Sequence, residues 1–233
     1  MTKLGKLIDA FLELIYPSLC AGCKGVSTEP ICKDCLAKIE MINEPICRYC
    51  GRSTEYDVEE CRDCRGKKLH FDGARALFEF EGTGKDIIHS FKYDRETRLA
   101  PMIAERIVER RWFTDLDMVT FVPLFGRKKI ERGYDQAELI AKEISRLSGI
   151  RHVRLLKRDR YTKDQNKLDH IARRKNVSGA FSSTDIHPVL EKSILLVDDV
   201  YTTGRTISEC AKILKAEGAK SVYGAVAAKA IIR

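Results

Sequence analysis

The chain has 233 residues, 44% of them hydrophobic, which is enough to bury a core in one or two domains. No apolar run approaches the ~18 residues of a membrane span, so the pattern predicts no membrane-spanning helix. The formal net charge is +8, but residues 125–175 carry 16 basic and 7 acidic side chains and hold the whole excess. Overall charge therefore does not indicate a nucleic-acid-binding protein, and any such argument depends on that one segment.

Residues 3–15 are predicted to form an amphipathic helix. Its apolar residues share one helical face: Leu4, Leu7, Ile8, Phe11, Leu12 and Ile15. Asp9 and Glu13 interrupt the apolar run, so the pattern does not indicate a secretory signal peptide. We expect this helix to pack on the rest of the protein.

Four Cys-x-x-Cys pairs fall within residues 20–64. They are Cys20 and Cys23, Cys32 and Cys35, Cys47 and Cys50, and Cys61 and Cys64. Each pair can present two sulfur atoms to one ion from a tight turn, so the eight cysteines predict two structural zinc ions with four ligands each. Redox-active dithiols are the alternative, but four pairs exceed what a redox site needs. Sequential pairing is the simplest assignment of pairs to ions, and interleaved pairing stays open.

Residues 1–69 are predicted to form one domain, which combines the N-terminal helix with this double zinc module. Apolar residues between the cysteine pairs are few, so bound metal is expected to supply most of the folding free energy of the segment. Eight thiolates and two zinc ions would lower the net charge of the chain to about +4. The ninth cysteine, Cys210, stands apart and is expected to be a small core residue.

Residues 70–233 alternate short apolar strands with amphipathic helices, which is typical of an α/β domain with a mainly parallel sheet. The predicted strands are 74–80, 118–122, 153–156, 193–197 and 221–227, and the predicted helices are 83–91, 99–112, 136–148 and 207–217. Residues 126–134 are expected to form a basic loop, and residues 157–176 a mobile polar loop. Parallel sheets bind ligands at the carboxyl ends of strands, so the loops after Val122, Leu156 and Val197 are candidate site loops.

The most informative stretch runs from Ile194 to Thr206, where a buried strand leads into an acidic pair, a hydroxyl-rich loop and a helix. Asp198 and Asp199 stand where the strand is expected to end, and can accept hydrogen bonds from two ribose hydroxyls. The loop continues with Thr202, Thr203, Gly204, Arg205 and Thr206. Backbone N–H groups, threonine hydroxyls and the helix N-terminus together favour a bound monophosphate. A helix cap by Thr206 is the simpler alternative, but a cap needs only one hydroxyl.

Basic residues at two other places are candidates for holding a second anionic group. Arg127, Lys128 and Arg132 follow the strand at 118–122, and Lys92 ends the helix at 83–91. Guanidinium and ammonium groups bind phosphate oxygens, whereas a solvated basic loop and a contact with the helix dipole are the alternatives. In the polar loop, residues 173–175 are two arginines and a lysine that could close over a bound substrate.

The stretch Val197-Asp198-Asp199-Val200-Tyr201-Thr202-Thr203-Gly204 looks like the phosphoribosyl pyrophosphate (PRPP) signature of the type I phosphoribosyltransferases. Further matching motifs are the eight-cysteine front, Phe91-Lys92-Tyr93, Val122-Pro123-Leu124 and Glu131-Arg132-Gly133-Tyr134-Asp135-Gln136. With them the chain resembles the ComF/GntX family over essentially its whole length. Asp135 replaces the asparagine usual in that family, and its charge argues against a direct anion contact. Arg205 stands where the phosphoribosyltransferases often have a small residue.

The resemblance implies a zinc-ribbon module followed by a type I phosphoribosyltransferase-like parallel sheet flanked by helices. It implies that the chain binds PRPP with Mg²⁺, and that Asp198 and Asp199 are the catalytic residues of a pentosyl transfer to an acceptor that the sequence does not reveal. It also implies a cytoplasmic role in natural competence and DNA uptake. The partners would be single-stranded DNA and competence proteins such as a DNA-translocating helicase.

Two other functions fit the same residues. The first is a non-catalytic competence factor that binds single-stranded DNA through the basic segment 125–175, or that senses PRPP as a regulator. The second treats the zinc module only as a platform for docking other proteins. The same basic charges suit PRPP alone, so charge does not discriminate between these functions and an enzyme.

Overall fold

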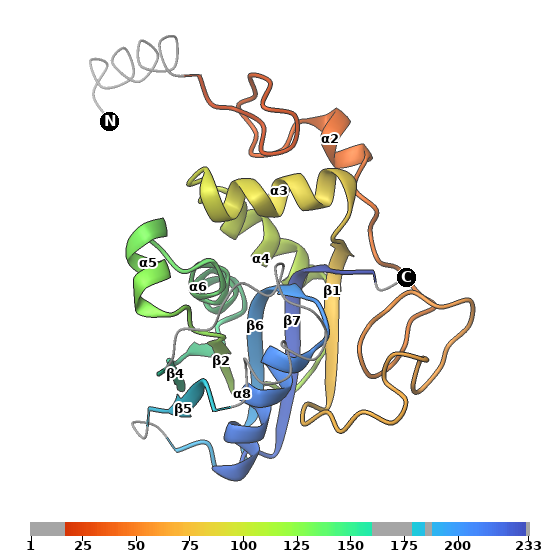
Figure 1. Ribbon diagram of the computed structural model, residues 1–233, viewed down its shortest axis with the longest axis vertical. Helices are drawn as coiled ribbons and strands as arrows, with labels where there is room; N and C mark the ends of the chain where they lie inside the picture. Colours follow the sequence, from red (N-terminus) through yellow and green to blue (C-terminus); the bar gives the residue numbers. More distant parts are fainter. Residues whose placement is uncertain (1–16, 160–178, 185–187, 232–233) are drawn as a thin grey trace.

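The computed structural model describes residues 17–159, 179–184 and 188–231. Its centre is a five-stranded, fully parallel sheet with the strand order β1-β7-β6-β2-β3 (Figure 1). The strands are β1 (Gly73–Glu79), β2 (Met118–Phe121), β3 (Arg151–His152), β6 (Ser193–Tyr201) and β7 (Ser221–Lys229). The adjacent strands β6 and β7 are the longest, and Tyr201 and Lys229 pair with each other at their carboxyl ends. The predicted α/β class with a parallel sheet is confirmed.

Helices cover both faces of the sheet. One buried core includes residues of α3 (Gly82–Tyr93), α4 (Leu99–Arg110) and α6 (Gln136–Ser148), and a second core on the other face includes residues of α8 (Arg205–Ala216). Figure 1 shows α3 crossing beyond the carboxyl ends of the strands. The remaining described elements are α2 (Lys33–Ala37), α5 (Gly126–Arg132) and an antiparallel pair, β4 (Leu156–Arg158) with β5 (Phe181–Ser183).

Several predicted elements need correction. The acidic pair does not follow the end of β6 but lies within it, because the strand continues to Tyr201 and keeps pairing with β7. The single strand predicted at 153–156 is replaced by β3 and β4, and residues 153–155 between them belong to neither strand. The basic loop predicted at 126–134 contains the helix α5. The last predicted helix starts two residues earlier than expected, at Arg205.

Two predicted segments lie wholly or largely outside the described residues. These are the amphipathic helix at 3–15 and the polar loop at 157–176, which includes the basic residues proposed to close over a substrate.

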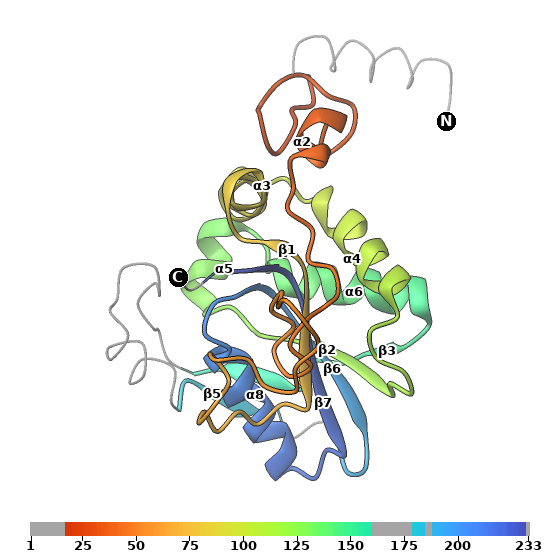
Figure 2. The same ribbon diagram turned by 90° about the vertical axis from the view of Figure 1, so that its right-hand side faces the viewer.

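The cysteine-rich segment forms two lobes that dock at different places on the α/β body (Figures 1 and 2). The first zinc lobe (residues 17–40) packs on α3, where the Ser90 hydroxyl donates to the backbone oxygen of Ala21 at 2.6 Å. The second zinc lobe (residues 41–71) lies along β1, and the backbone N–H of Ala74 donates to the Tyr49 oxygen at 2.8 Å. Buried residues of each lobe belong to one of the two cores of the α/β body. The predicted domain boundary between residues 69 and 70 stays a prediction.

Candidate functional site

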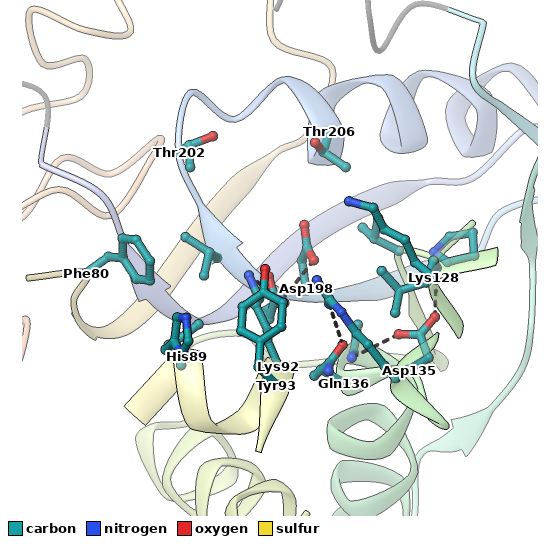
Figure 3. A pocket seen from close by; sticks show the side chains of 18 of the residues that line it. Phe80, His89, Lys92, Tyr93, Lys128, Asp135, Gln136, Asp198, Thr202 and Thr206 are labelled. Atoms are coloured by element: carbon teal, nitrogen blue, oxygen red, sulfur yellow. Dashed lines mark hydrogen bonds and ion pairs between the residues drawn. The ribbon is translucent and has the colours of Figure 1, made fainter. Parts of the chain in front are cut away.

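The acidic pair lines a pocket of about 330 Å³ at the carboxyl end of β6 (Figure 3). Lys92, which α3 supplies from above the sheet, forms an ion pair with Asp199, with its Nζ 2.9 Å from Oδ2. The side chains of Lys92 and Asp199 are 20% and 15% exposed, so this contact is only partly open to water. Asp198 accepts a hydrogen bond from the backbone N–H of Asp199 at 2.9 Å. Both carboxylates therefore line one cavity, and the Lys92 ammonium group lies between Asp199 and α3.

The electrostatics of this pair favour positively charged or hydrogen-bond-donating ligands. Burial and the neighbouring Asp199 carboxylate raise the pKa of Asp198 well above its usual value, while the Asp199 N–H and the Lys92 ammonium act in the opposite direction. A cation or a pair of donating hydroxyls placed beside the carboxylates would stabilise their ionised form. Ribose hydroxyls and a metal-bound water both meet that description.

The loop after β6 leads directly into α8 and presents the helix N-terminus to the pocket. Gly204 is the N-cap of α8 and has a left-handed backbone conformation with φ 76°. The first turn of this 12-residue helix contains no acidic residue, so the positive partial charge of its N-terminus is not offset from within the helix. Thr202 and Thr206 line the pocket, and Figure 3 shows both on one side of Asp198. This end of the pocket has the features of an anion site.

A basic wall closes the pocket on the side of α5. Lys128 and Arg132 line the cavity, and the Arg132 guanidinium lies 5.1 Å from the centre of the Tyr93 ring. Arg132 also donates to the Gln136 side-chain oxygen at 3.1 Å. These contacts hold its charge at the pocket rather than in bulk solvent.

Asp135 also borders the pocket, but backbone groups occupy its carboxylate. It is the N-cap of α6, and its oxygens accept hydrogen bonds from the N–H groups of Leu124, Ala137 and Glu138. The side chain is 2% exposed. Its role in the structure is to fix the turn after β2 against the start of α6.

The structure brings together seven of the residues that the sequence analysis proposed for ligand binding. They are Lys92, Lys128, Arg132, Asp198, Asp199, Thr202 and Thr206. Arg127, Thr203, Gly204 and Arg205 do not line the described part of this pocket. Arg127 is 78% exposed and pairs with Glu131 at 3.0 Å, whereas Thr203 is buried.

Other pocket residues were not proposed from the sequence. Phe80 at the end of β1, Lys85 and His89 on α3, and Arg158 on β4 all line the cavity. Lys85, His89 and Lys92 are spaced by four and three residues, so they share one face of α3. That polar stripe was the available signal for Lys85 and His89. No local pattern indicates Phe80 or Arg158, because the sheet topology alone brings them to the site.

The eight cysteines of the paired motifs form two separate clusters in the sequential order. Cys20, Cys23, Cys32 and Cys35 make the first cluster, and Cys47, Cys50, Cys61 and Cys64 make the second. Sulfur–sulfur distances are 3.9 Å for Cys23–Cys32, 3.7 Å for Cys50–Cys61 and 3.8 Å for Cys61–Cys64. A tetrahedral zinc site with Zn–S bonds of about 2.3 Å separates its sulfurs by about 3.8 Å. Both clusters therefore fit a structural zinc ion, and interleaved pairing is excluded.

Comparison with protein families agrees with these two regions. Residues 11–65 match the double zinc ribbon domain, and residues 132–232 match the phosphoribosyl transferase domain. The protein is therefore a double zinc ribbon joined to a phosphoribosyltransferase-type domain. The same arrangement and the relatives described next show that the chain belongs to the ComF family.

Three relatives match over most of their length. Competence protein F of Haemophilus influenzae is 27% identical over 87% of this chain and 93% of its own. DNA utilization protein YhgH of Escherichia coli K12 is 26% identical over 90% of this chain and 96% of its own. Competence protein ComFC of Streptococcus pneumoniae is 28% identical over 82% of this chain and 84% of its own.

Solved structures with partial likeness include two phosphoribosyl-handling enzymes. Glutamine PRPP amidotransferase from B. subtilis has a TM-score of 0.40 and 19% identity, over 56% of this chain and 26% of that one. Purine phosphoribosyltransferase from Pyrococcus horikoshii has a TM-score of 0.34 and 18% identity, over 61% and 83%. The fold assignment rests on the sheet and the family match.

Along the described residues, no helix has the length and apolarity needed to cross a membrane.

Proposed function

We propose that the pocket binds PRPP together with Mg²⁺ and that the protein transfers the phosphoribosyl group. The observation that carries this proposal is the acidic pair of β6 lying between an anion-binding helix N-terminus and a basic wall in one cavity. PRPP has the matching order of groups: a 5′-phosphate, a ribose with two hydroxyls, and a pyrophosphate on the anomeric carbon. The family match to a phosphoribosyl transferase domain supports the same ligand.

The proposed pose assigns each group of the ligand to a wall of the pocket. The 5′-phosphate would lie against Thr202, Thr206 and the backbone N–H groups at the start of α8. Asp198 and Asp199 would accept hydrogen bonds from the ribose hydroxyls. Lys128 and Arg132 would hold the pyrophosphate, and bound Mg²⁺ would supply further positive charge there. Lys92, which pairs with Asp199 in the described structure, lines the same pocket.

The chemistry that this arrangement supports is displacement of pyrophosphate at the anomeric carbon. The bond from that carbon to the pyrophosphate oxygen breaks, and a bond to the nucleophilic atom of the acceptor forms. Positive charge develops on the ribose ring as the leaving group departs with its electron pair. Carboxylates beside the ribose stabilise that charge, and the basic side chains stabilise the leaving anion.

We further propose that this activity or ligand binding serves the handling of DNA. The support is the names of the relatives, which are competence and DNA utilization proteins matched over most of their length. A direct contact with single-stranded DNA or with a helicase rests on the family resemblance alone. Isotope-labelled PRPP offered with bases, nucleotides and single-stranded DNA would identify an acceptor by label transfer.

The binding proposal is tested by calorimetry with PRPP and Mg²⁺. The double variant Asp198→Asn, Asp199→Asn keeps the shape of the pair but removes both charges. Hydrogen bonds to charged groups contribute about 1.5–3 kcal/mol each, so the affinity for PRPP should fall about 100-fold or more. Unchanged affinity would refute the assignment of these two residues.

A matched control is Asp86→Asn, which removes an exposed carboxylate from α3 outside the pocket lining. Its affinity for PRPP should equal that of the wild type. Thermal unfolding of all variants checks that the double variant is folded. Because the pKa of Asp198 is raised in the fold, neutralising this residue should not lower stability at neutral pH.

A further inference from the structure

Lys229 is a buried lysine that does not line the proposed ligand pocket. It is 6% exposed, at the carboxyl end of the inner strand β7. Buried ammonium groups are costly unless an anion or a π system compensates the charge. Its Nζ lies 3.5 Å from the centre of the Tyr201 ring, on the neighbouring strand β6. The ammonium group of Lys229 therefore lies over the face of the Tyr201 ring.

Lys229 lies beside the second cysteine cluster, because Cys50, Cys64, Tyr201 and Lys229 line one small cavity. A zinc ion with four thiolates carries a net charge of −2, and such sites depend on nearby donors that orient and neutralise their ligands. Lys229 supplies one positive charge and one donor at this place.

Tyr201 continues the contact toward the proposed phosphate site. Its ring is 5% exposed and packs edge-on against Phe71 of the second zinc lobe, with centroids 6.2 Å apart. Its hydroxyl lies against Gly204, the N-cap of α8. A small cavity on the other side of the loop is lined by Cys50, Cys64, Tyr201, Thr202, Thr203 and Lys229. The second cluster and the hydroxyl loop are therefore two sides of one packed unit.

We propose that Lys229 is a positioning residue that couples the second zinc site to the phosphate loop through Tyr201. Zinc in the second cluster holds Lys229, Lys229 holds the Tyr201 ring, and Tyr201 supports Gly204 at the start of α8. Zinc binding at that cluster and anion binding at the loop then strengthen each other, since coupling between two sites is reciprocal. The part of this inference that concerns the anion rests on the proposed function, whereas the part that concerns zinc does not.

The first experiment measures zinc loss from each cluster separately. A zinc-selective chelator is added to the full-length zinc-loaded protein, and thiols that become free are alkylated and quantified by mass spectrometry of the two sets of cysteine peptides. Loss of a group that orients metal ligands typically weakens metal affinity about 10–100-fold. Lys229→Met should therefore accelerate alkylation of the second cluster about 10-fold and leave the first cluster unchanged.

Two variants keep this result interpretable. Lys68→Met removes an exposed lysine from the same lobe and should behave like the wild type. Lys229→Arg keeps the positive charge and should retain most of the protection, which a general loss of packing would not allow. Equal rates in Lys229→Met and the wild type, or equal acceleration of both clusters, would overturn the role of Lys229.

The second experiment tests the coupling. Saturating PRPP with Mg²⁺ should slow alkylation of the second cluster in the wild type and have no such effect in Lys229→Met. If calorimetry shows that PRPP binds and the wild-type rate does not change, the coupling is wrong. If calorimetry shows no PRPP binding, the proposed function fails, and the zinc-loss comparison still decides whether Lys229 supports the second cluster.

Discussion

Asp135 is a buried carboxylate with three backbone hydrogen bonds, placed between the turn after β2 and the start of α6. Burial raises its pKa to about 6, although the N–H groups of Leu124 and Glu138 oppose the shift. The residue motif alone showed an acid where the family usually has asparagine, and its charge argued against a direct anion contact, which stays a prediction. It could not show the cap, because the Leu124 contact depends on how the turn folds back.

The raised pKa of Asp135 predicts how stability depends on pH. A folded-state pKa of about 6, against an ordinary value of 3.8, means that this group contributes most below pH 3.8 and that its contribution is lost as pH rises through 6. The loss amounts to roughly 3 kcal/mol. In urea unfolding from pH 4 to 7, the stability of Asp135→Asn relative to the wild type should therefore rise with pH by up to this amount.

The absolute stability of Asp135→Asn includes a constant penalty, because the amide cannot accept from all three N–H groups. The change with pH is therefore the informative quantity. Asp117→Asn is the control, since a hydrogen bond from the Ser193 N–H and the Lys192 ammonium lower the pKa of Asp117. Its effect on stability should be nearly constant above pH 5. A difference for Asp135→Asn that is flat from pH 4 to 7 would contradict the prediction.

Elements of the α/β body were predicted where local patterns carry the information. Apolar strands and one-sided helices identify the sheet and its covering helices, and α6 was predicted at its observed bounds. The helix α5 was not predicted from the sequence because none of its residues is buried. Ile130 is 84% exposed, so no apolar stripe marks the helix. The end of β6 was misplaced because its polar residues pair with β7, which only the tertiary fold reveals. The pairing of β4 with β5 is likewise non-local.

The junction of β6 and α8 depends on one glycine. Gly204 has a positive φ of 76°, and a Cβ at this position would overlap the Tyr201 hydroxyl and lie 2.5 Å from the ring carbon that carries it. Tyr201 is buried between Phe71 and Lys229 and has little room to move. Gly204→Ala should therefore lower the free energy of unfolding by about 1–3 kcal/mol and weaken PRPP binding at least about 10-fold.

Gly126→Ala is the matched control for this junction. Gly126 starts α5, and a Cβ there would meet no atom within 4 Å. Its stability should change by less than about 0.5 kcal/mol. Thermal unfolding and calorimetry measure both quantities, and a Gly204→Ala protein as stable as the wild type would show that the loop adapts without strain.

The two zinc lobes and the α/β body share their cores rather than standing apart. Ile39 of the first lobe is buried with residues of α3 and α4, and Ile42 and Phe71 of the second lobe are buried with residues of α8. Arg98, between α3 and α4, donates to the backbone oxygens of Leu19 and Thr28. The sequence predicted that the cysteine segment has little core of its own. It gave no sign of where each lobe docks, because those contacts join residues far apart in the chain.

Zinc removal is therefore expected to destabilise the whole described fold and not only the cysteine segment. Loss of both lobes would expose parts of two cores and remove several docking hydrogen bonds of about 1 kcal/mol each, so the unfolding temperature should fall by about 10 °C or more. Calorimetry with and without a zinc-selective chelator measures this shift, and hydrogen exchange should increase in β1 and α3. Cys210→Ala, which changes a buried cysteine outside both clusters, should keep both zinc ions and show the same chelator shift. A chain that loses both ions at an unchanged unfolding temperature would show that the α/β body folds independently of its zinc lobes.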